Sequence, residues 1–190
     1  MNYYAKTDIG KVRSKNQDQA AVNANTKDQV IALVCDGMGG HRSGEIASRV
    51  VMDHFMSCFG IIPPFDNSDE LKKWLQETIV ECDQIVKKMA MQNIEHQGMG
   101  TTIVVAIYMD NKLYISHVGD SRAYILKDNQ LSQITKDHTL VNELVDRGAI
   151  SEQEAKHHMK KNVLTQAIGA QTELKPSLIE MDFDDGILLL

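Results

Sequence analysis

The chain has 190 residues, of which 43% are hydrophobic and 24% are charged, and its formal net charge is -6. This length and composition predict one folded domain with a substantial core and argue against a disordered chain. A negative net charge without a run of Lys or Arg argues against a nucleic acid as the main partner.

Cysteine usage and the first residues of the chain bear on its location. Cys35, Cys58 and Cys82 are odd in number and lack C-x-x-C spacing, so we expect buried free thiols rather than disulfides or zinc ligands. The first residues have no signal-peptide pattern, and no stretch approaches the length of a membrane span. Together these features predict a cytoplasmic protein.

The first informative element is an apolar run over residues 30–35 that ends at Asp36 and is followed by Gly37, Gly39 and Gly40. The run predicts a strand buried on both faces that brings one carboxylate to a polar site. The glycines permit a positive φ and close approach of the backbone. Because such a turn is often only a tight turn, the interpretation depends on partners elsewhere in the chain.

Two long helices follow in the predicted order. Apolar residues at helical spacing indicate that the first helix begins directly after the glycines, near Ser43. A break at residues 60–67 precedes the second helix, which Asn67 opens with Glu70 in a capping box. We assign the Met and aromatic residues of its apolar stripe to the core rather than to a ligand pocket.

From Thr101 onward the period changes to that of strands. Residues 102–108, 113–118 and 123–126 predict an antiparallel meander. Two short helices follow, one from Asp137 to Gly148 and one opened by Ser151 with Glu154. The order of elements predicts an α+β fold with helices outside packed sheets.

Three carboxylates lie where strands meet turns: Asp18, Asp36 and Asp120. Each could project from one edge of a sheet. Carboxylates gathered in one place raise each other's pKa unless cations neutralise them, and magnesium or manganese suits such oxygen ligands. The alternative, that each Asp is an ordinary turn residue, stays open at this point.

Six motifs then occur in order, and together they carry a resemblance. They are Arg13-x-x-Asn16-x-Asp18, Asp36-Gly-Met-Gly-Gly-His-x-x-Gly-Glu45, Gly98-Met-Gly-Thr-Thr102, Val118-Gly-Asp-Ser-Arg122, Thr135-Lys-Asp-His138 and Asn162-Val-Leu-Thr-Gln-Ala-Ile-Gly169. In order and spacing the chain resembles the metal-dependent Ser/Thr protein phosphatases of the PPM, or type-2C, family in its bacterial form. The resemblance extends from Thr7 to Leu190.

The resemblance implies a four-layer α-β-β-α sandwich in a single domain, residues 1–190, with a mobile flap at about 146–162. Two or three Mn²⁺ or Mg²⁺ ions would lie at one edge of the central sheets. Asp36 would bind or bridge the metals, Gly37 would offer its backbone carbonyl, and Asp18 would hold a metal-bound water. Asp120 would help to bind a third metal, and Arg13 would clamp the phosphate. The substrates would be phosphoserine and phosphothreonine in proteins, including a Ser/Thr kinase and its targets.

Some residues depart from the family pattern. Met38 stands where eukaryotic members often have His, so the proton for the leaving group must come from water or from elsewhere. His41 matches a motif position that has no assigned role in proton transfer. Gln17 replaces a Glu that many relatives carry, which removes one carboxylate near Asp18.

The C-terminal sequence departs further. Residues 183–190 end in what reads as a buried strand, before two motifs that supply further metal-binding Asp residues in the family. We therefore expect a C-terminally incomplete domain with weak or no activity. A phosphatase-like module that binds phosphoproteins without hydrolysis stays open as an alternative. Nucleotide binding is disfavoured, because neither G-x-G-x-x-G nor a G-K-[ST] ending occurs.

Overall fold

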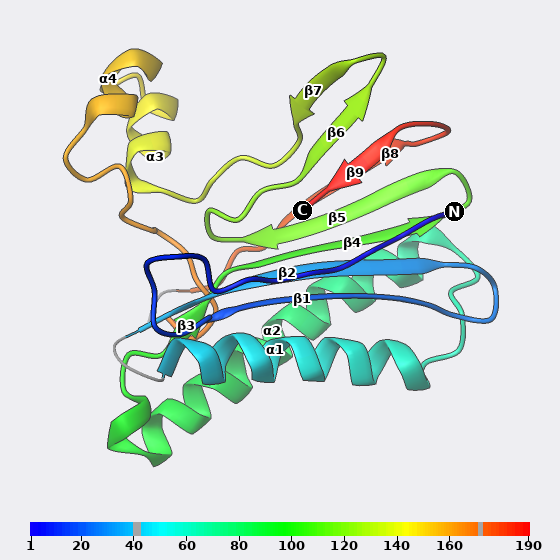
Figure 1. The fold of residues 1–190 in the computed structure, drawn as a ribbon, viewed down its shortest axis with the longest axis horizontal. Helices are drawn as coiled ribbons and strands as arrows, with labels where there is room; N and C mark the ends of the chain where they lie inside the picture. The colour runs from blue at the N-terminus through cyan, green and yellow to red at the C-terminus, as the bar shows by residue number, and fades with distance from the viewer. Residues whose placement is uncertain (40–42, 171–172) are drawn as a thin grey trace.

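The computed structural model describes residues 1–39, 43–170 and 173–190. Gly40 and His41 of the glycine-rich turn therefore lie outside the described residues. The fold has two helices against one face of a six-stranded antiparallel sheet and a three-stranded sheet against the opposite face (Figure 1). This arrangement confirms the predicted α+β sandwich.

The larger sheet has the strand order β1-β2-β4-β5-β8, with the short β3 paired to β2. Its strands are β1 (Asp18–Ala24), β2 (Val30–Met38), β3 (Gly100–Thr101), β4 (Ile103–Met109), β5 (Lys112–Val118) and β8 (Ser177–Asp182). The smaller sheet has the order β7-β6-β9, with β6 (Tyr124–Lys127), β7 (Gln130–Gln133) and β9 (Ile187–Leu189).

The predicted meander is right for β4 and β5 and wrong for the third run. Residues of β6 pair with β7 and β9 in the smaller sheet, while β8 takes the free edge of β5. The physical reason is the turn after β5, where Gly119 has a φ of 104° and redirects the chain. Strand β6 consequently lies in the smaller sheet instead of extending the larger one, and its Ile125 is buried in the core between the two sheets.

The strand predicted at the end of the chain is present as β9, but it is not fully buried. Leu188 packs toward the core between the sheets, whereas Ile187 and Leu189 are 55% and 44% exposed. A strand with one face on the core alternates in this way. The prediction of a buried strand was therefore wrong for one of its two faces.

The helices on the other side of the sheet are α1 (Ser43–Ile61) and α2 (Ser68–Gln92), followed by a short 3-10 turn, η1 (Ile94–His96). Asn67 caps α2 by accepting a 2.9 Å hydrogen bond from the amide of Glu70, as predicted. The Glu70 carboxylate, however, accepts from the amide of Asp66 at 3.4 Å, so the capping box is displaced by one residue. Trp74 of α2 packs against three Phe rings of this core, with centroid distances of 5.4 to 6.2 Å.

Two short helices, α3 (Leu140–Asp146) and α4 (Glu152–His157), form a lobe beside the sheets (Figure 1). The capping box of Ser151 and Glu154 is confirmed at the start of α4. Thr139, not Asp137, caps α3. The base of the lobe is closed by hydrogen bonds from Leu140 N to Val163 O and from Thr165 N to His138 O, both 2.9 Å.

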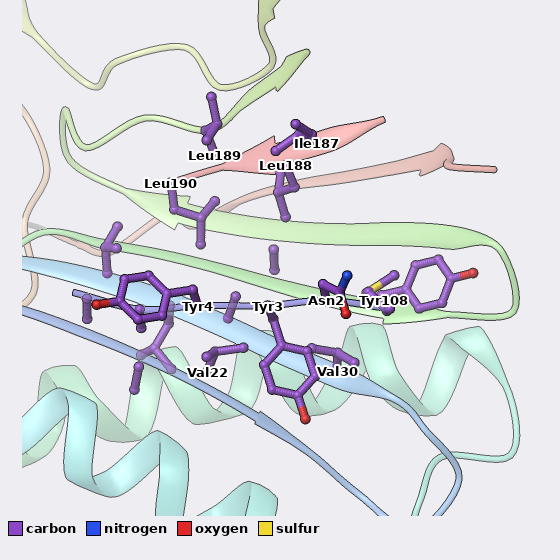
Figure 2. A pocket seen from close by; sticks show the side chains of 18 of the residues that line it. Asn2, Tyr3, Tyr4, Val22, Val30, Tyr108, Ile187, Leu188, Leu189 and Leu190 are labelled. Carbon is purple, nitrogen blue, oxygen red and sulfur yellow. The ribbon is translucent and has the colours of Figure 1, made fainter. Parts of the chain in front are cut away.

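The three cysteines are free; the predicted burial is confirmed for Cys35 and Cys82 and wrong for Cys58, which is only partly buried. Among the described helices none combines the length and the apolar character that crossing a bilayer requires. A cavity of about 760 Å³ lies between the N-terminal residues, the face of β1, β2 and β4, and β9. Figure 2 shows that its walls are mainly aliphatic and aromatic, with Val22, Val30 and Leu190 among them.

Candidate active site

The structure brings the predicted carboxylates to one edge of the larger sheet. Asp18, the first residue of β1, lies directly opposite Asp36 in the antiparallel register of β1 and β2. Asp120 follows the end of β5, and the loop that carries Arg13 precedes β1 on the same side of the molecule (Figure 1). Residues separated by more than 100 positions in the sequence therefore face one another.

The pKa values at this edge show that its carboxylates repel one another. The pKa of Asp36 rises from an ordinary 3.8 to about 6, because of burial first, then the negative charge of Asp18 and the hydrogen bond that a protonated Asp36 shares with Asp18, and then the charge of Asp120. The Arg13 guanidinium lowers the pKa of Asp36 but does not compensate for these effects. Burial also raises the pKa of Asp120. Without a further positive charge, the negative charge at this edge is therefore costly.

Asp18 carries a second sign of a cation site. Its Oδ1 atom is buried and, while Asp36 is ionised, has no hydrogen-bond donor among the described residues. A buried carboxylate oxygen without a partner costs free energy unless a cation neutralises it. Divalent cations with hard, oxygen-preferring chemistry match a set of carboxylates. The residues at this edge therefore fit the metal ions that the family resemblance implies.

The backbone of Asp36 is fixed by two neighbouring threonines. Its amide donates to Thr102 Oγ1 at 3.0 Å, and its carbonyl accepts from Thr101 Oγ1 at 2.9 Å. Thr102 Oγ1 also lies 2.6 Å from Ser121 Oγ, in the turn that carries Asp120. The two carboxylates are thus positioned by one hydroxyl, a role that the sequence did not reveal although both threonines lie in a motif of the family.

Gly37 and Gly44 place the end of β2 against the first turn of α1. A Cβ atom on Gly37 would lie 2.1 Å from Gly44 O, and one on Gly44 would lie 2.7 Å from Gly37 O. No side chain fits at either position. The contact is held further by Gln17 O, which accepts from Gly37 N at 3.1 Å and from Ser48 Oγ at 2.6 Å.

The turn that carries Asp120 is clamped by His138. The backbone N of His138 donates to Gly119 O at 2.9 Å, and Gly119 N donates to the His138 Nδ1 atom at 3.2 Å. His138 Nε2 lies 2.9 Å from Ser177 Oγ at the start of β8. Because Nδ1 accepts a hydrogen bond, the imidazole is neutral with its proton on Nε2.

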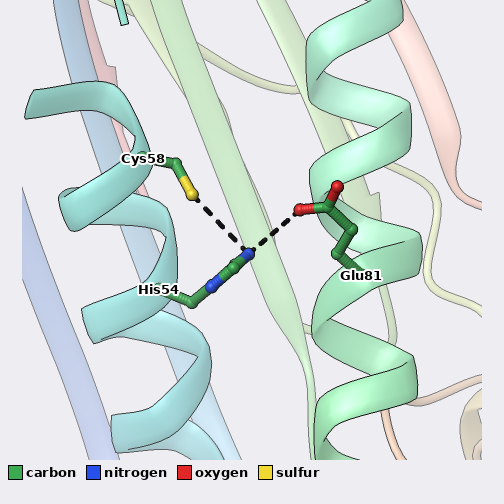
Figure 3. A group of neighbouring side chains, drawn as sticks. All are labelled: His54, Cys58 and Glu81. Atoms are coloured by element: carbon green, nitrogen blue, oxygen red, sulfur yellow. Dashed lines mark hydrogen bonds and ion pairs between the residues drawn. The ribbon is translucent and has the colours of Figure 1, made fainter. Parts of the chain in front are cut away.

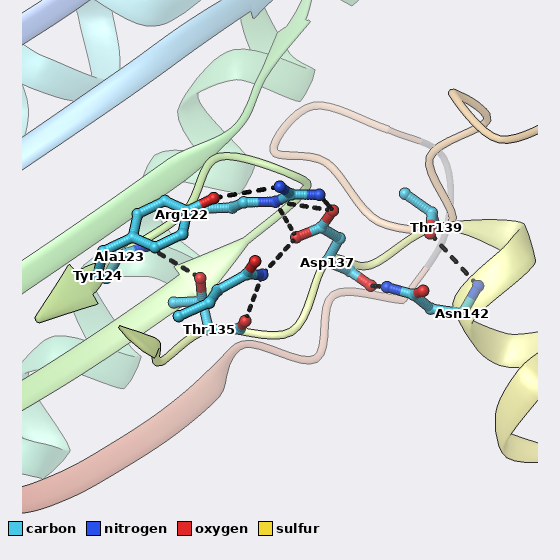
Figure 4. A network of polar contacts seen from close by, with 8 residues as sticks. Arg122, Ala123, Tyr124, Thr135, Asp137, Thr139 and Asn142 are labelled. Atoms are coloured by element: carbon cyan, nitrogen blue, oxygen red, sulfur yellow. Dashed lines mark hydrogen bonds and ion pairs between the residues drawn. The ribbon is translucent and has the colours of Figure 1, made fainter. Parts of the chain in front are cut away.

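Next to Asp120, Arg122 links the site to the lobe of α3 and α4. Figure 4 shows its guanidinium on the Asp137 carboxylate, with Nη2 to Oδ2 at 2.7 Å and Nε to Oδ1 at 2.9 Å. The Asp137 carbonyl accepts from Asn142 Nδ2 in α3 at 2.9 Å. A two-pronged contact of this kind fixes orientation as well as distance. The beginning of the lobe is therefore tied to the turn that carries Asp120.

Arg13, the remaining predicted site residue, lies close enough to this edge to act on the pKa of Asp36. Arg13 is exposed, and no hydrogen bond or ion pair joins it to another residue in the described ranges. Met38, at the end of β2, is 37% exposed. The apolar cavity of Figure 2 contains none of these residues and no group of converging charges, so we do not assign it to the chemistry of the carboxylates.

Comparison with known proteins agrees with this geometry. Residues 4–144 match the family model of protein phosphatase 2C. The chain is 36% identical to the serine/threonine phosphatase stp of Listeria monocytogenes, over 97% of this chain and 73% of that protein.

Two solved structures extend the comparison. The fold matches the crystal structure of the serine/threonine phosphatase Stp1 from Staphylococcus aureus with a TM-score of 0.89 and 36% identity, over 96% of this chain and 72% of that one. The catalytic domain of the serine/threonine protein phosphatase PstP, solved with two manganese ions, matches with a TM-score of 0.78 and 32% identity, over 96% and 72%. The carboxylate edge, the sandwich and these matches together show that the chain belongs to the protein phosphatase 2C family, the metal-dependent protein serine/threonine phosphatases.

Proposed function

We propose that this phosphatase hydrolyses phosphoserine and phosphothreonine in proteins at the edge formed by Asp18, Asp36 and Asp120. The observation that supports this site most strongly is the unpartnered, buried Oδ1 of Asp18 beside Asp36, whose pKa is raised to about 6. Both features mark a place that lacks positive charge. A phosphate monoester carries negative charge itself, so it could bind here only together with cations.

We infer that Asp18, Asp36 and Asp120, with the backbone carbonyl of Gly37, hold two or three Mn²⁺ or Mg²⁺ ions. Such ions, when bound, activate water and neutralise charge on phosphoryl oxygens. The protein's own part is orientation. The amide of Asp18 donates to Asn16 Oδ1 at 3.0 Å, which fixes the start of β1 and so the direction of the carboxylate that would accept a proton from water.

Arg13 would bind the phosphate. It lies near enough to Asp36 to lower the pKa of that carboxyl, and it is exposed, so its guanidinium is available to a ligand from solvent. The planar guanidinium suits two phosphate oxygens at once. The leaving group takes its proton from water in this scheme, because Met38 has no group that could donate one.

The flap at about residues 146–162, which includes α4, would contact the protein around the phosphorylated residue. The link from Arg122 through Asp137 to α3 supports this proposal, because it ties the lobe to the turn of Asp120. We further propose a Ser/Thr kinase and its targets as substrates, on the family resemblance. A cytoplasmic location is supported by the free cysteines, which a reducing compartment preserves.

The test is hydrolysis of a phosphothreonine peptide with manganese, comparing the wild type with Asp36→Asn. The matched control is Asp28→Asn, an exposed aspartate in the turn before β2. We expect turnover to require the ion, to vanish on chelation, to fall by roughly 10²-fold or more in Asp36→Asn and to persist in the control. Equal turnover by both variants would contradict the assignment of the site, and absence of turnover in a folded wild type would favour a module that only binds.

A further inference from the structure

A second group of metal-ligating side chains lies on the helix layer, apart from the carboxylate edge. His54 and Cys58 are one turn apart on α1, and Glu81 faces them from α2 (Figure 3). Residues at positions i and i+4 share one face of a helix, so both α1 side chains point toward α2. The protein phosphatase function assigns nothing to these three residues.

Their ligand atoms converge on one point. His54 Nε2 lies 3.2 Å from Glu81 Oε2 and 3.6 Å from Cys58 Sγ, and all three atoms lie within 4.8 Å of one another. The same ring nitrogen thus faces both the sulfur and the carboxylate. To take the thiol proton, the facing ring nitrogen must be unprotonated, but here the same nitrogen also faces the Glu81 carboxylate, which favours a proton on it. The arrangement therefore does not activate the thiol as a nucleophile, whereas a shared central ion would satisfy all three atoms.

The dimensions agree with zinc. Zinc binds His nitrogen, Cys sulfur and carboxylate oxygen at roughly 2.0–2.3 Å, and the edges of a tetrahedron of that size are about 3.3–3.8 Å. The two distances from His54 Nε2 are 3.2 and 3.6 Å, close to that range. The third separation, between Cys58 Sγ and a Glu81 carboxylate oxygen, is at most 4.8 Å, and the Glu81 side chain is 57% exposed, so it can adjust its position.

We propose that His54, Cys58 and Glu81 bind one zinc ion that ties α1 to α2, with water in the fourth position. A thiolate and an imidazole favour zinc over magnesium and manganese, so this site differs in chemistry from the all-oxygen carboxylate edge. Zinc displaces the thiol proton of Cys58 to solvent and bonds to the thiolate. The thiol is protonated before the ion binds, since burial and the charge of Glu81 raise the pKa of Cys58.

The first experiment is cobalt titration of the full chain, followed by zinc. Cobalt is expected to give a thiolate-to-cobalt charge-transfer band at one equivalent, and zinc is expected to remove it. Cys58→Ser should abolish the band, whereas Cys82→Ala, which changes a buried cysteine outside the group, should keep it. The carboxylate edge has no thiol, so cobalt bound there gives no such band. A missing band in the wild type, or a band that survives Cys58→Ser, overturns the proposal.

The second experiment is thermal unfolding with and without zinc. At a zinc concentration about a hundredfold above the dissociation constant, we expect the wild-type midpoint to rise by roughly 5–10 °C. In Cys58→Ser, shown to be folded by circular dichroism, zinc should raise the midpoint by no more than half as much as in the wild type. Equal rises in the wild type and Cys58→Ser would mean that zinc binds elsewhere, at the active site included, and would refute the proposed site.

Discussion

Replacing Asp36 with Asn should stabilise the metal-free chain near neutral pH, although the change removes a residue that we place at the centre of catalysis. In the folded chain, burial and the charges of Asp18 and Asp120 raise the pKa of Asp36 from 3.8 to about 6. An acid whose pKa is raised by folding favours the folded state while it is protonated. Its contribution is therefore complete below about pH 4 and is lost as the pH rises through about 6.

The size of the effect follows from the two pKa values. A rise from 3.8 to about 6 corresponds to roughly 3 kcal/mol at neutral pH. Because Asp36 is partly exposed, water and salt screen part of this free energy, and we expect about 1–2 kcal/mol. For a domain of this size that is a rise of about 2–8 °C in the unfolding midpoint.

The assay is urea or thermal unfolding in EDTA over a series of pH values. The stability difference between Asp36→Asn and wild type should be small near pH 4 and largest above about pH 7. Saturating manganese should reverse the order, because only the wild type gains the full binding free energy of the ions. Asp28→Asn should differ from wild type by less than about 0.5 kcal/mol throughout. A variant that is no more stable than wild type at pH 7 in EDTA would refute the reasoning.

Three further changes test the elements that position the site. Gly44→Ala should lower the free energy of unfolding by about 1–3 kcal/mol and remove most of the activity, because its Cβ would lie 2.7 Å from backbone atoms of β2. The control is Gly60→Ala, whose Cβ meets no atom within 4 Å and which should raise the free energy of unfolding in urea by about 0.5–1 kcal/mol. Thr102→Val should cost about 1–3 kcal/mol and lower turnover by unpairing an amide of the site, and Thr102→Ser should recover most of both. Arg122→Lys should lose about 1 kcal/mol and lower kcat through its paired contact, while Arg147→Lys, on an exposed ion pair, should stay within about 0.5 kcal/mol.

Much of the site could be predicted because strand ends leave clear signals in a sequence. The apolar run before Asp36 and the glycines after it indicated a strand that delivers one carboxylate, and Asp120 likewise follows a β-type run. What the sequence could not give is register. The direct opposition of Asp18 and Asp36 depends on how β1 pairs with β2, and a shift of one residue would move every side chain to the other face.

Long-range pairing explains the other errors. The sequence of β6 resembles those of β4 and β5 in composition, so it was predicted to pair with β5. Nothing in the β6 sequence indicates that β8 takes that place at the edge of β5. Asp137 resembles a helix cap in the sequence, but its carboxylate binds Arg122, so Thr139 takes the cap. Residues that hold the site through hydroxyls and glycine contacts, such as Thr102 and Gly44, show their role only when the strands and α1 are in place.

The closed base of the α3 and α4 lobe has a consequence for how such a protein can diverge. The lobe begins after His138 and ends before Thr165, and these two residues are joined by a hydrogen bond from Thr165 N to His138 O. Everything between them is one loop in topological terms, and doubling the length of a flexible loop costs only about 0.6 kcal/mol of closure entropy. Insertions and deletions within the lobe can therefore accumulate with little effect on the carboxylate edge, so the surface beside the edge can change while the edge itself is retained.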